Sequence, residues 1–227
     1  MSPFDSLGFL LLLLLTFSSG CTKKLSNEVT AICLVENRPC LKGKALVEIT
    51  TNRGIIHLEL NGDAAPVTAG NFLDLVNKGV YENTVFHRVI KTPSPFILQG
   101  GDPLSKSLNT PEINYGKGSF IDPKNGQIRF IPLEIKLKTE DAPRYNELIT
   151  SAKQLSELTL PHQKGSVAMT RSQSLGSGSS QFYIALKSLP QLDGRYSVFG
   201  KVVEGMNVLE KIIEGDIILK TNLIKGN

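Results

Sequence analysis

Residue types that build metal sites are scarce in this sequence, and a clustered basic run is lacking. Its 227 residues include 3 cysteines, 3 histidines and no tryptophan, and no histidine or second cysteine pair stands at the spacing of zinc ligands. Lysine and arginine are scattered, with no basic run beyond Lys23 and Lys24. The net charge of +4 is therefore too diffuse for a nucleic-acid surface. We expect no metal or other cofactor and no nucleic-acid partner.

Long apolar runs are also lacking. The main run, 9–15, is too short for a membrane span, which needs about 20 residues. Small residues and then Cys21 follow it, an arrangement similar to a bacterial lipobox, although Asp5 precedes the run without any Lys or Arg and Ser18 replaces an aliphatic residue. We favour a lipoprotein leader over 1–20 with lipidation at Cys21. A plain secretion signal and an uncleaved anchor are the alternatives.

In each of these cases the chain is exported, to the periplasm or to a thylakoid or outer-envelope face. With the favoured lipoprotein leader, a lipid anchor holds it on a membrane. Residues 21–43 are polar and aperiodic and predict a tether. Cys33 and Cys40 lie within it. In an oxidising compartment two nearby cysteines can pair, so a disulfide and two unpaired thiols remain open alternatives.

The rest of the chain alternates short apolar segments with turns, which is typical of a mainly β domain, here expected over 44–222. A hairpin is predicted over 45–60 around Asn52-Arg53-Gly54. Pro66 suits the first turn of a helix over 66–79. Further elements are predicted as strands at 85–90, 96–99, 165–170, 181–186, 196–203 and 217–219, and as a last helix at 206–214. Many short strands with two regular helices predict a closed β-barrel capped by helices.

The segment 103–164 departs from this pattern. A turn at 122–126 between apolar segments predicts a second hairpin, and 131–135 predicts a short edge strand. Leucine, isoleucine and alanine recur near helical spacing over 143–160, which predicts an amphipathic helix. We interpret this segment as an insertion in the β domain.

The stretch 85–102, VFHRVIKTPSPFILQGGD, carries the clearest chemical signal. Arg88 lies on a predicted strand between apolar residues. An arginine on a half-buried strand needs a partner for its guanidinium. Gln99 is a plausible partner if the second short strand runs beside the first. These residues predict one arginine held above an apolar floor.

Five motifs together resemble the cyclophilin family of peptidyl-prolyl isomerases. They are FHRVI (86–90), F-x-x-QGGD (96–102), GSVAMTRS (165–172), SSQFYI (179–184) and LDGRYSVFGKVVEGMNVLEKI (192–212). The match runs from about residue 46 to residue 218, in the family's order. The resemblance implies an eight-stranded antiparallel barrel with a helix closing each end.

The family's catalytic arginine corresponds to Arg88, and Gln99 resembles the glutamine that holds it and the substrate backbone. Rotation about an X-Pro bond is slow because the amide nitrogen shares its lone pair with the carbonyl. In the twisted transition state that lone pair returns to nitrogen, where a guanidinium hydrogen can bind it. Such selective binding of the twisted form accelerates rotation without a nucleophile or a titrating base.

The resemblance also implies a substrate-binding surface. Four apolar residues resemble the floor and walls of a proline pocket, three others an edge segment that pairs with the substrate backbone, and two complete the pocket rim. In that order they are Phe96, Ile97, Tyr183 and Leu192; Thr170, Arg171 and Ser172; and Gln181 and Tyr196. For the apolar residues, ordinary core packing is the alternative.

The chain also differs from the common family pattern. Tyr183 stands where many members have Phe, Tyr196 where many have His, and Gln191 where some have the Trp that gives sensitivity to cyclosporin. The loop 91–95 is longer than usual. We interpret His87 as structural and His57 and His162 as isolated histidines.

The expected function is cis-trans isomerisation of X-Pro bonds in exported proteins by a monomer whose partners are proline-containing polypeptides. One alternative is a proline-binding chaperone or scaffold with little turnover, suggested by the longer loop and the insertion. A second is a structural envelope lipoprotein, which rests on the leader alone.

Overall fold

The computed structural model describes residue 33, residues 38–107 and residues 109–226. The leader expected over 1–20 and the lipidation site expected at Cys21 lie outside the described residues. In the described part of the chain, no helix is both long and apolar enough to cross a membrane.

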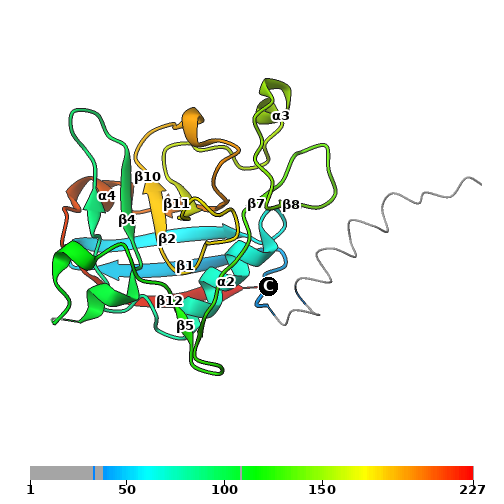
Figure 1. Cartoon of the computed structure of the whole chain (residues 1–227). Coiled ribbons are helices and arrows are strands. Elements are labelled where there is room, and N and C mark those ends of the chain that lie inside the picture. Colours follow the sequence, from blue (N-terminus) through cyan, green and yellow to red (C-terminus); the bar gives the residue numbers. More distant parts are fainter. Residues whose placement is uncertain (1–32, 34–37, 108, 227) are drawn as a thin grey trace, which may run out of the picture.

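An eight-stranded antiparallel sheet, curled around a buried core, forms most of the fold (Figure 1). Neighbouring strands follow the order β12-β1-β2-β11-β9-β10-β4-β3. Their bounds are β1 Lys44–Thr51, β2 Gly54–Asn61, β3 Arg88–Val89, β4 Ile97–Gly100, β9 Ser166–Met169, β10 Phe182–Ala185, β11 Val198–Glu204 and β12 Ile218–Gly226. The expected mainly β, eight-stranded antiparallel fold is confirmed.

The two ends of this sheet meet through backbone hydrogen bonds between residues 83–86, before β3, and residues 215–218, where β12 begins. Val85 and Ile217 form a single antiparallel bridge, and Phe86 N–H donates to the Asp216 carbonyl at 2.8 Å. The strand expected over 85–90 is shorter in the structure, because β3 comprises Arg88 and Val89, and Ile90 adds one hydrogen bond from its N–H to the Ile97 carbonyl of β4 at 2.9 Å. Closure of the sheet into a barrel stays a prediction.

The β1–β2 hairpin follows the alternation of its sequence. Val47 and Ile49 of β1 and Ile56 and Leu58 of β2 are fully buried, and the register pairs Ile49 with Ile56. Successive residues of a strand face opposite sides, so each strand buries one face of the hairpin. Gly54 begins β2 with a φ of +136°, which L side chains rarely adopt.

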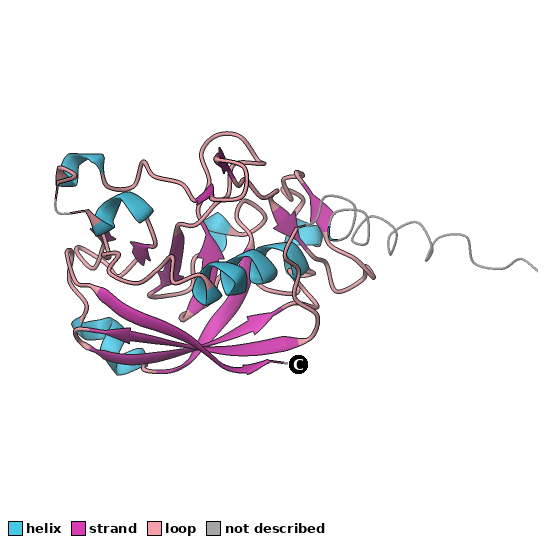
Figure 2. Ribbon diagram, turned by 90° about the horizontal axis from the view of Figure 1, so that it is seen from below, coloured by secondary structure: helices cyan, strands magenta, loops and turns pink. Residues whose placement is uncertain are grey.

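Helix α2 (Pro66–Asn77) packs against β2, β11 and β12 and lies along one side of the sheet (Figure 2). Its Phe72 ring lies 4.8 Å from the ring of Tyr81, 5.3 Å from Phe182 and 5.0 Å from Phe199, measured between centroids. Burying one such ring stabilises the fold by about 1.5–3 kcal/mol. A shorter helix, α4 (Met206–Lys211), packs on β2.

The segment 103–164 consists of short elements. They are the 3-10 turns η2 Pro103–Lys106 and η3 Glu112–Asn114, the strands β5 Ile121–Asp122, β6 Gln127–Ile128, β7 Glu134–Ile135 and β8 Arg144–Tyr145, and the helix α3 Ala152–Ser156. Strands β5 and β6 pair as the predicted hairpin, and β7 pairs with β8. A further 3-10 turn, η4 Pro190–Leu192, precedes β11.

The helix predicted over 143–160 is wrong, since only the five residues of α3 are helical there. The apolar residues that suggested it, Ile149 and Leu158, are buried with Leu133 and Leu137 in a separate small cluster. Leu137 and Leu158 form an antiparallel bridge. Extended segments therefore bury these side chains, and the apparent helical spacing is coincidental.

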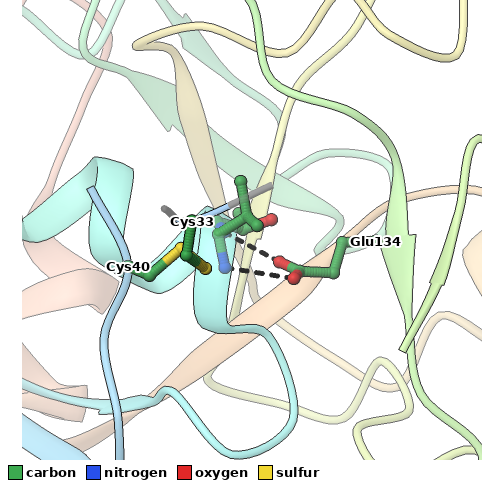
Figure 3. The surroundings of a disulfide bond; sticks show 5 residues. Cys33, Cys40 and Glu134 are labelled. Carbon is green, nitrogen blue, oxygen red and sulfur yellow. Dashed lines mark hydrogen bonds between the residues drawn. A yellow bond between two sulfur atoms is a disulfide. The ribbon is translucent and has the colours of Figure 1, made fainter. Parts of the chain in front are cut away.

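The N-terminal part of the described chain is fastened to α2. Cys33 and Cys40 form a disulfide beside the helix (Figure 3), and Leu41 is a buried core residue whose N–H donates to the Pro66 carbonyl at 3.0 Å. Residues 40 and 41, the last part of the expected tether, thus pack on the domain. At the other end, β12 pairs with β1 as far as Gly226 and is longer than the strand predicted at 217–219.

Candidate active site

Arg88 and Gln99 face each other across the β3–β4 pair. They are register partners, and Arg88 Nη1 lies 3.5 Å from Gln99 Oε1. The sequence predicted an arginine on a half-buried strand, but β3 is an outer strand of the sheet and Arg88 is exposed. The guanidinium is therefore free of the desolvation cost of a buried charge and is accessible from solvent.

A chain of amide hydrogen bonds continues from Gln99. Its Nε2 donates to Gln181 Oε1 at 3.2 Å, and Gln181 Nε2 donates to the Gly118 carbonyl at 2.7 Å. Each amide uses one donor and one acceptor along this chain, so the orientation of both glutamines is fixed. Arg88 thus stands at the outer end of an ordered polar row that crosses from β3 through β4 to the loop at Gly118.

An apolar wall lies beside this row. Ile97 and Gln99 are two residues apart on β4 and therefore point to the same face of the sheet. Tyr183 of β10 is the register partner of Gln99, so its side chain shares that face. Ile97 and Tyr183 are buried, in a cluster separate from the main core. The partly buried Phe96, Leu192 and Tyr196 pack against the same cluster. All five apolar and aromatic residues assigned to the pocket are therefore brought together.

The predicted edge segment follows β9. Thr170 N–H donates to the Gln181 carbonyl at 3.0 Å. Arg171 places its Cζ 5.0 Å from the centroid of the Tyr196 ring, a cation–π contact, and its Nε donates to the Arg195 carbonyl at 2.8 Å. Ser172 N–H donates to Ser177 Oγ at 2.9 Å. This segment thus joins the polar row to the aromatic part of the wall.

A cavity of about 430 Å³ extends from the polar row. Its lining includes Gln99, Gln181, Thr170, Arg171 and Ser172 on one side, with residues of 116–119 and of the β5–β6 hairpin on the other. The apolar wall residues and Arg88 do not line it. A second cavity, of about 460 Å³, lies between α2 and the β5–β6 hairpin and contains none of the predicted site residues.

Sequence reasoning missed one member of the site. His162, interpreted as isolated, is buried, with its Nε2 2.8 Å from Tyr183 Oη and its Nδ1 2.7 Å from Asp193 Oδ1. His57 is not isolated either, because its Nδ1 lies 2.7 Å from Glu204 Oε2. No local spacing signals either contact, since the partners are far apart in the sequence.

Burial favours the neutral forms of His162, Tyr183 and His87. Burial lowers the pKa of His162 against the opposing effect of the Asp193 carboxylate, and burial raises the pKa of Tyr183 well above its usual range. Burial also lowers the pKa of His87. Among the described residues, no group of three or more His, Cys, Asp or Glu could hold a metal ion. The arrangement offers hydrogen bonds, the guanidinium groups of Arg88 and Arg171, and an apolar surface.

Comparison with known proteins identifies the family of this chain. The family described as cyclophilin type peptidyl-prolyl cis-trans isomerase/CLD matches residues 46–224, and the chain belongs to this family. The chain is 40% identical, over 84% of its length, to a protein of Synechocystis sp. that is named as a thylakoid lumen peptidyl-prolyl cis-trans isomerase. The match covers 49% of that protein. The chain is also 34% identical, over 77% of its length, to a peptidyl-prolyl cis-trans isomerase of Helicobacter pylori, and the match covers 84% of that protein.

A solved structure shows the same fold. A cyclophilin type peptidyl-prolyl cis-trans isomerase of Cryptosporidium parvum superposes with a TM-score of 0.58 at 27% identity, covering 81% of this chain and 99% of that one. The chain spans about half the length of the Synechocystis relative.

Proposed function

We propose that this chain is an exported peptidyl-prolyl cis-trans isomerase in which Arg88 binds the twisted X-Pro amide above the apolar wall. One observation carries the proposal: Arg88, Gln99 and Gln181 form a hydrogen-bonded row beside a cluster built around Ile97 and Tyr183. Family membership supports it. The pyrrolidine ring of a substrate proline lies against the apolar wall, and the preceding carbonyl is held by the polar row.

The catalytic step requires only selective binding. As the amide twists, its nitrogen becomes pyramidal and regains a lone pair, which accepts a hydrogen bond from the Arg88 guanidinium. The planar amide lacks that lone pair, so the contact stabilises the transition state more than the ground state. A rate gain of about five decades needs about 7 kcal/mol from this contact, desolvation and positioning together.

The substrate backbone runs along Thr170, Arg171 and Ser172, and residues preceding proline extend toward the 430 Å³ cavity. In this arrangement the β5–β6 hairpin borders the groove rather than closing it, because Ile128 and Phe130 line the cavity and are themselves exposed. The domain over 44–222 acts as a monomer, and its sheet closes into a barrel capped by α2 and α4.

Export follows from the leader over 1–20, and the lumenal name of the Synechocystis relative supports it. We infer lipidation at Cys21, which would hold the domain on a membrane face through 21–43. Mass spectrometry of the mature protein should detect a diacylated or triacylated Cys21. A mature N-terminus without acyl chains would refute the anchor and leave the isomerase proposal untouched.

A second function, a proline-binding chaperone with little turnover, is favoured by one observation. Arg88 lies 3.5 Å from Gln99, at the long end of a hydrogen bond, and is exposed. Two-dimensional exchange NMR on an Ala-Pro-Phe peptide separates the two functions. Exchange cross-peaks that grow with the protein at catalytic concentration indicate an isomerase, whereas peptide shifts without faster exchange indicate the chaperone.

A further inference from the structure

Two buried side chains, His162 and Tyr183, and the partly buried Asp193 form a hydrogen-bonded chain behind the apolar wall. Asp193 Oδ1 lies 2.7 Å from His162 Nδ1, and His162 Nε2 lies 2.8 Å from Tyr183 Oη. His162 is 1% exposed and Tyr183 is 3% exposed. The two rings are stacked, with 6.0 Å between centroids and 9° between planes. Neither ring can turn without losing a buried hydrogen bond.

The geometry fixes the tautomer of His162. Asp193 Oδ1 also accepts a hydrogen bond from the backbone N–H of His162, at 2.7 Å. An ionised carboxylate can only accept hydrogen bonds, so the ring nitrogen that lies 2.7 Å from Asp193 Oδ1 must donate, and Nδ1 carries the proton. Nε2 then presents a lone pair and accepts the hydroxyl proton of Tyr183.

Tyr183 transmits this arrangement to the polar row and to the wall. It is the register partner of Gln99, and its ring meets that of Tyr196 edge to face at 5.7 Å. It is buried with Ile97 in the cluster that forms the wall. The position of one phenol ring therefore sets the surface against which a proline would rest.

We propose that His162, oriented by Asp193, is a positioning residue for Tyr183 and that protonation of His162 disables the proline pocket. The proposal rests on the isomerase function proposed above and adds a regulation by pH to it. A protonated His162 carries a hydrogen on Nε2 as well as on Nδ1. Two donors then face each other at Tyr183, and its hydroxyl must turn away to another acceptor.

In the part of the chain that the structure describes, the Tyr183 hydroxyl makes its hydrogen bond to His162 Nε2, so protonation of His162 removes the acceptor that this hydroxyl uses. The ring therefore shifts and the wall loses its fixed shape. Since a buried polar group without a partner is costly, the pocket rearranges instead of tolerating the unmatched hydroxyl.

Other ionisable groups surround the chain without taking part in it. Glu134, Lys136 and Tyr196 line the small cavity that His162 also lines. Glu134 accepts N–H groups of α2, and Lys136 Nζ donates to the Asp63 carbonyl. Arg171 lies over the far ring, that of Tyr196. Protonation of His162, and not of these groups, therefore changes which atom donates and which accepts in the hydrogen bond to Tyr183.

The test is the pH profile of kcat/KM for the Ala-Pro-Phe peptide between about pH 5 and about pH 8.5, the range in which histidine titrates. Four full-length proteins are compared: the wild type, His162→Gln, His162→Phe and the distant control His57→Gln. Unfolding midpoints recorded at each pH separate loss of activity from loss of fold.

We expect the wild-type kcat/KM to fall about tenfold or more on acidification. His162→Gln should flatten the profile, because a carboxamide can accept from Tyr183 and donate to Asp193 without titrating. His162→Phe should raise KM at every pH, since it leaves the Tyr183 hydroxyl unpaired. His57→Gln should keep the wild-type profile.

A flat wild-type profile, an acid limb retained in His162→Gln, or an acid limb that coincides with unfolding would overturn the positioning role. A wild type without exchange at any pH has a different meaning, because it refutes the isomerase function itself and this regulation with it.

Discussion

At the residue scale, Glu134 shows how a buried carboxylate supports the fold. Its two carboxylate oxygens accept the N–H groups of Val67 at 3.1 Å and Thr68 at 2.8 Å, in the first turn of α2 (Figure 3). The first N–H groups of a helix have no partner within the helix, and a negative charge there is favourable. A glutamate from another part of the chain therefore supplies the cap that Ala65, the residue before the helix, does not.

We expect Glu134→Ala to lower the free energy of unfolding by about 2–3 kcal/mol, because two buried N–H groups lose their acceptor. Urea unfolding followed by far-UV circular dichroism measures the change. Glu112→Ala, at an exposed position of the same insertion, should stay within about 0.5 kcal/mol of the wild type. An equal and small effect of both substitutions would contradict the capping role.

The destabilisation caused by Glu134→Ala should depend on pH. Burial raises the pKa of Glu134 above its usual range, against the opposing hydrogen bonds to Thr68 and Val67. A raised pKa in the folded state means that the carboxyl contributes most below its unfolded pKa of about 4.3. That contribution is lost as the pH rises through the folded value. The destabilisation by Glu134→Ala should therefore be larger near pH 4 than near pH 7.

The sequence could predict Arg88 and Gln99 as partners because the turn residues between them allow two short strands to run side by side. It could not predict His162 as a partner of Tyr183, since hydrogen bonds between residues on separate loops and strands leave no periodic trace. The exposure of Arg88 was missed for a related reason. Which strand lies outermost in the sheet is decided by long-range pairing.

At the scale of elements, α2 and the segment around Cys40 meet so closely that a side chain is excluded. A Cβ added at Gly70 would lie 2.4 Å from Cys40 Cα and 2.6 Å from the Leu41 backbone nitrogen. These are backbone atoms held by the disulfide and by the bond from Leu41 to Pro66. They cannot move aside as the end of a flexible side chain could.

We therefore expect Gly70→Ala to destabilise the protein, although alanine in place of glycine inside a helix normally stabilises by about 1 kcal/mol. Thermal unfolding should show a lower midpoint. Gly176→Ala is the matched control, because its added Cβ would meet only Asn146 side-chain atoms, the nearest at 3.5 Å. A raised midpoint for Gly70→Ala would show that the segment does not press on the helix.

Elements with strong local signals were predictable and those without them were not. Alternation and a turn tripeptide identified the β1–β2 hairpin, and Pro66 marked the start of α2. The expected helix over 143–160 failed because Ile149 and Leu158 are buried against Leu133 and Leu137. Spacing in one segment cannot reveal that its apolar residues serve a cluster formed with another.

At the scale of the whole molecule, the curled sheet separates two apolar clusters with different tasks. The main core, which includes Phe72 and Phe182, holds α2 on the strands. The smaller cluster around Ile97 and Tyr183 lies on the other face of β4 and β10, beside the polar row. Rigid strands therefore support the wall from behind, which is how a surface keeps the shape that selective binding needs.

Arg88 is proposed to lower the barrier to X-Pro rotation, and one experiment tests this role directly. Exchange NMR on the Ala-Pro-Phe peptide should be recorded with the wild type, Arg88→Ala and Lys220→Ala. Lys220, on the exposed face of β12, controls for the loss of a surface charge. We expect Lys220→Ala to match the wild type and Arg88→Ala to lose more than about tenfold in exchange rate, which corresponds to about 1.4 kcal/mol. Equal catalysis by the wild type and Arg88→Ala would contradict the account.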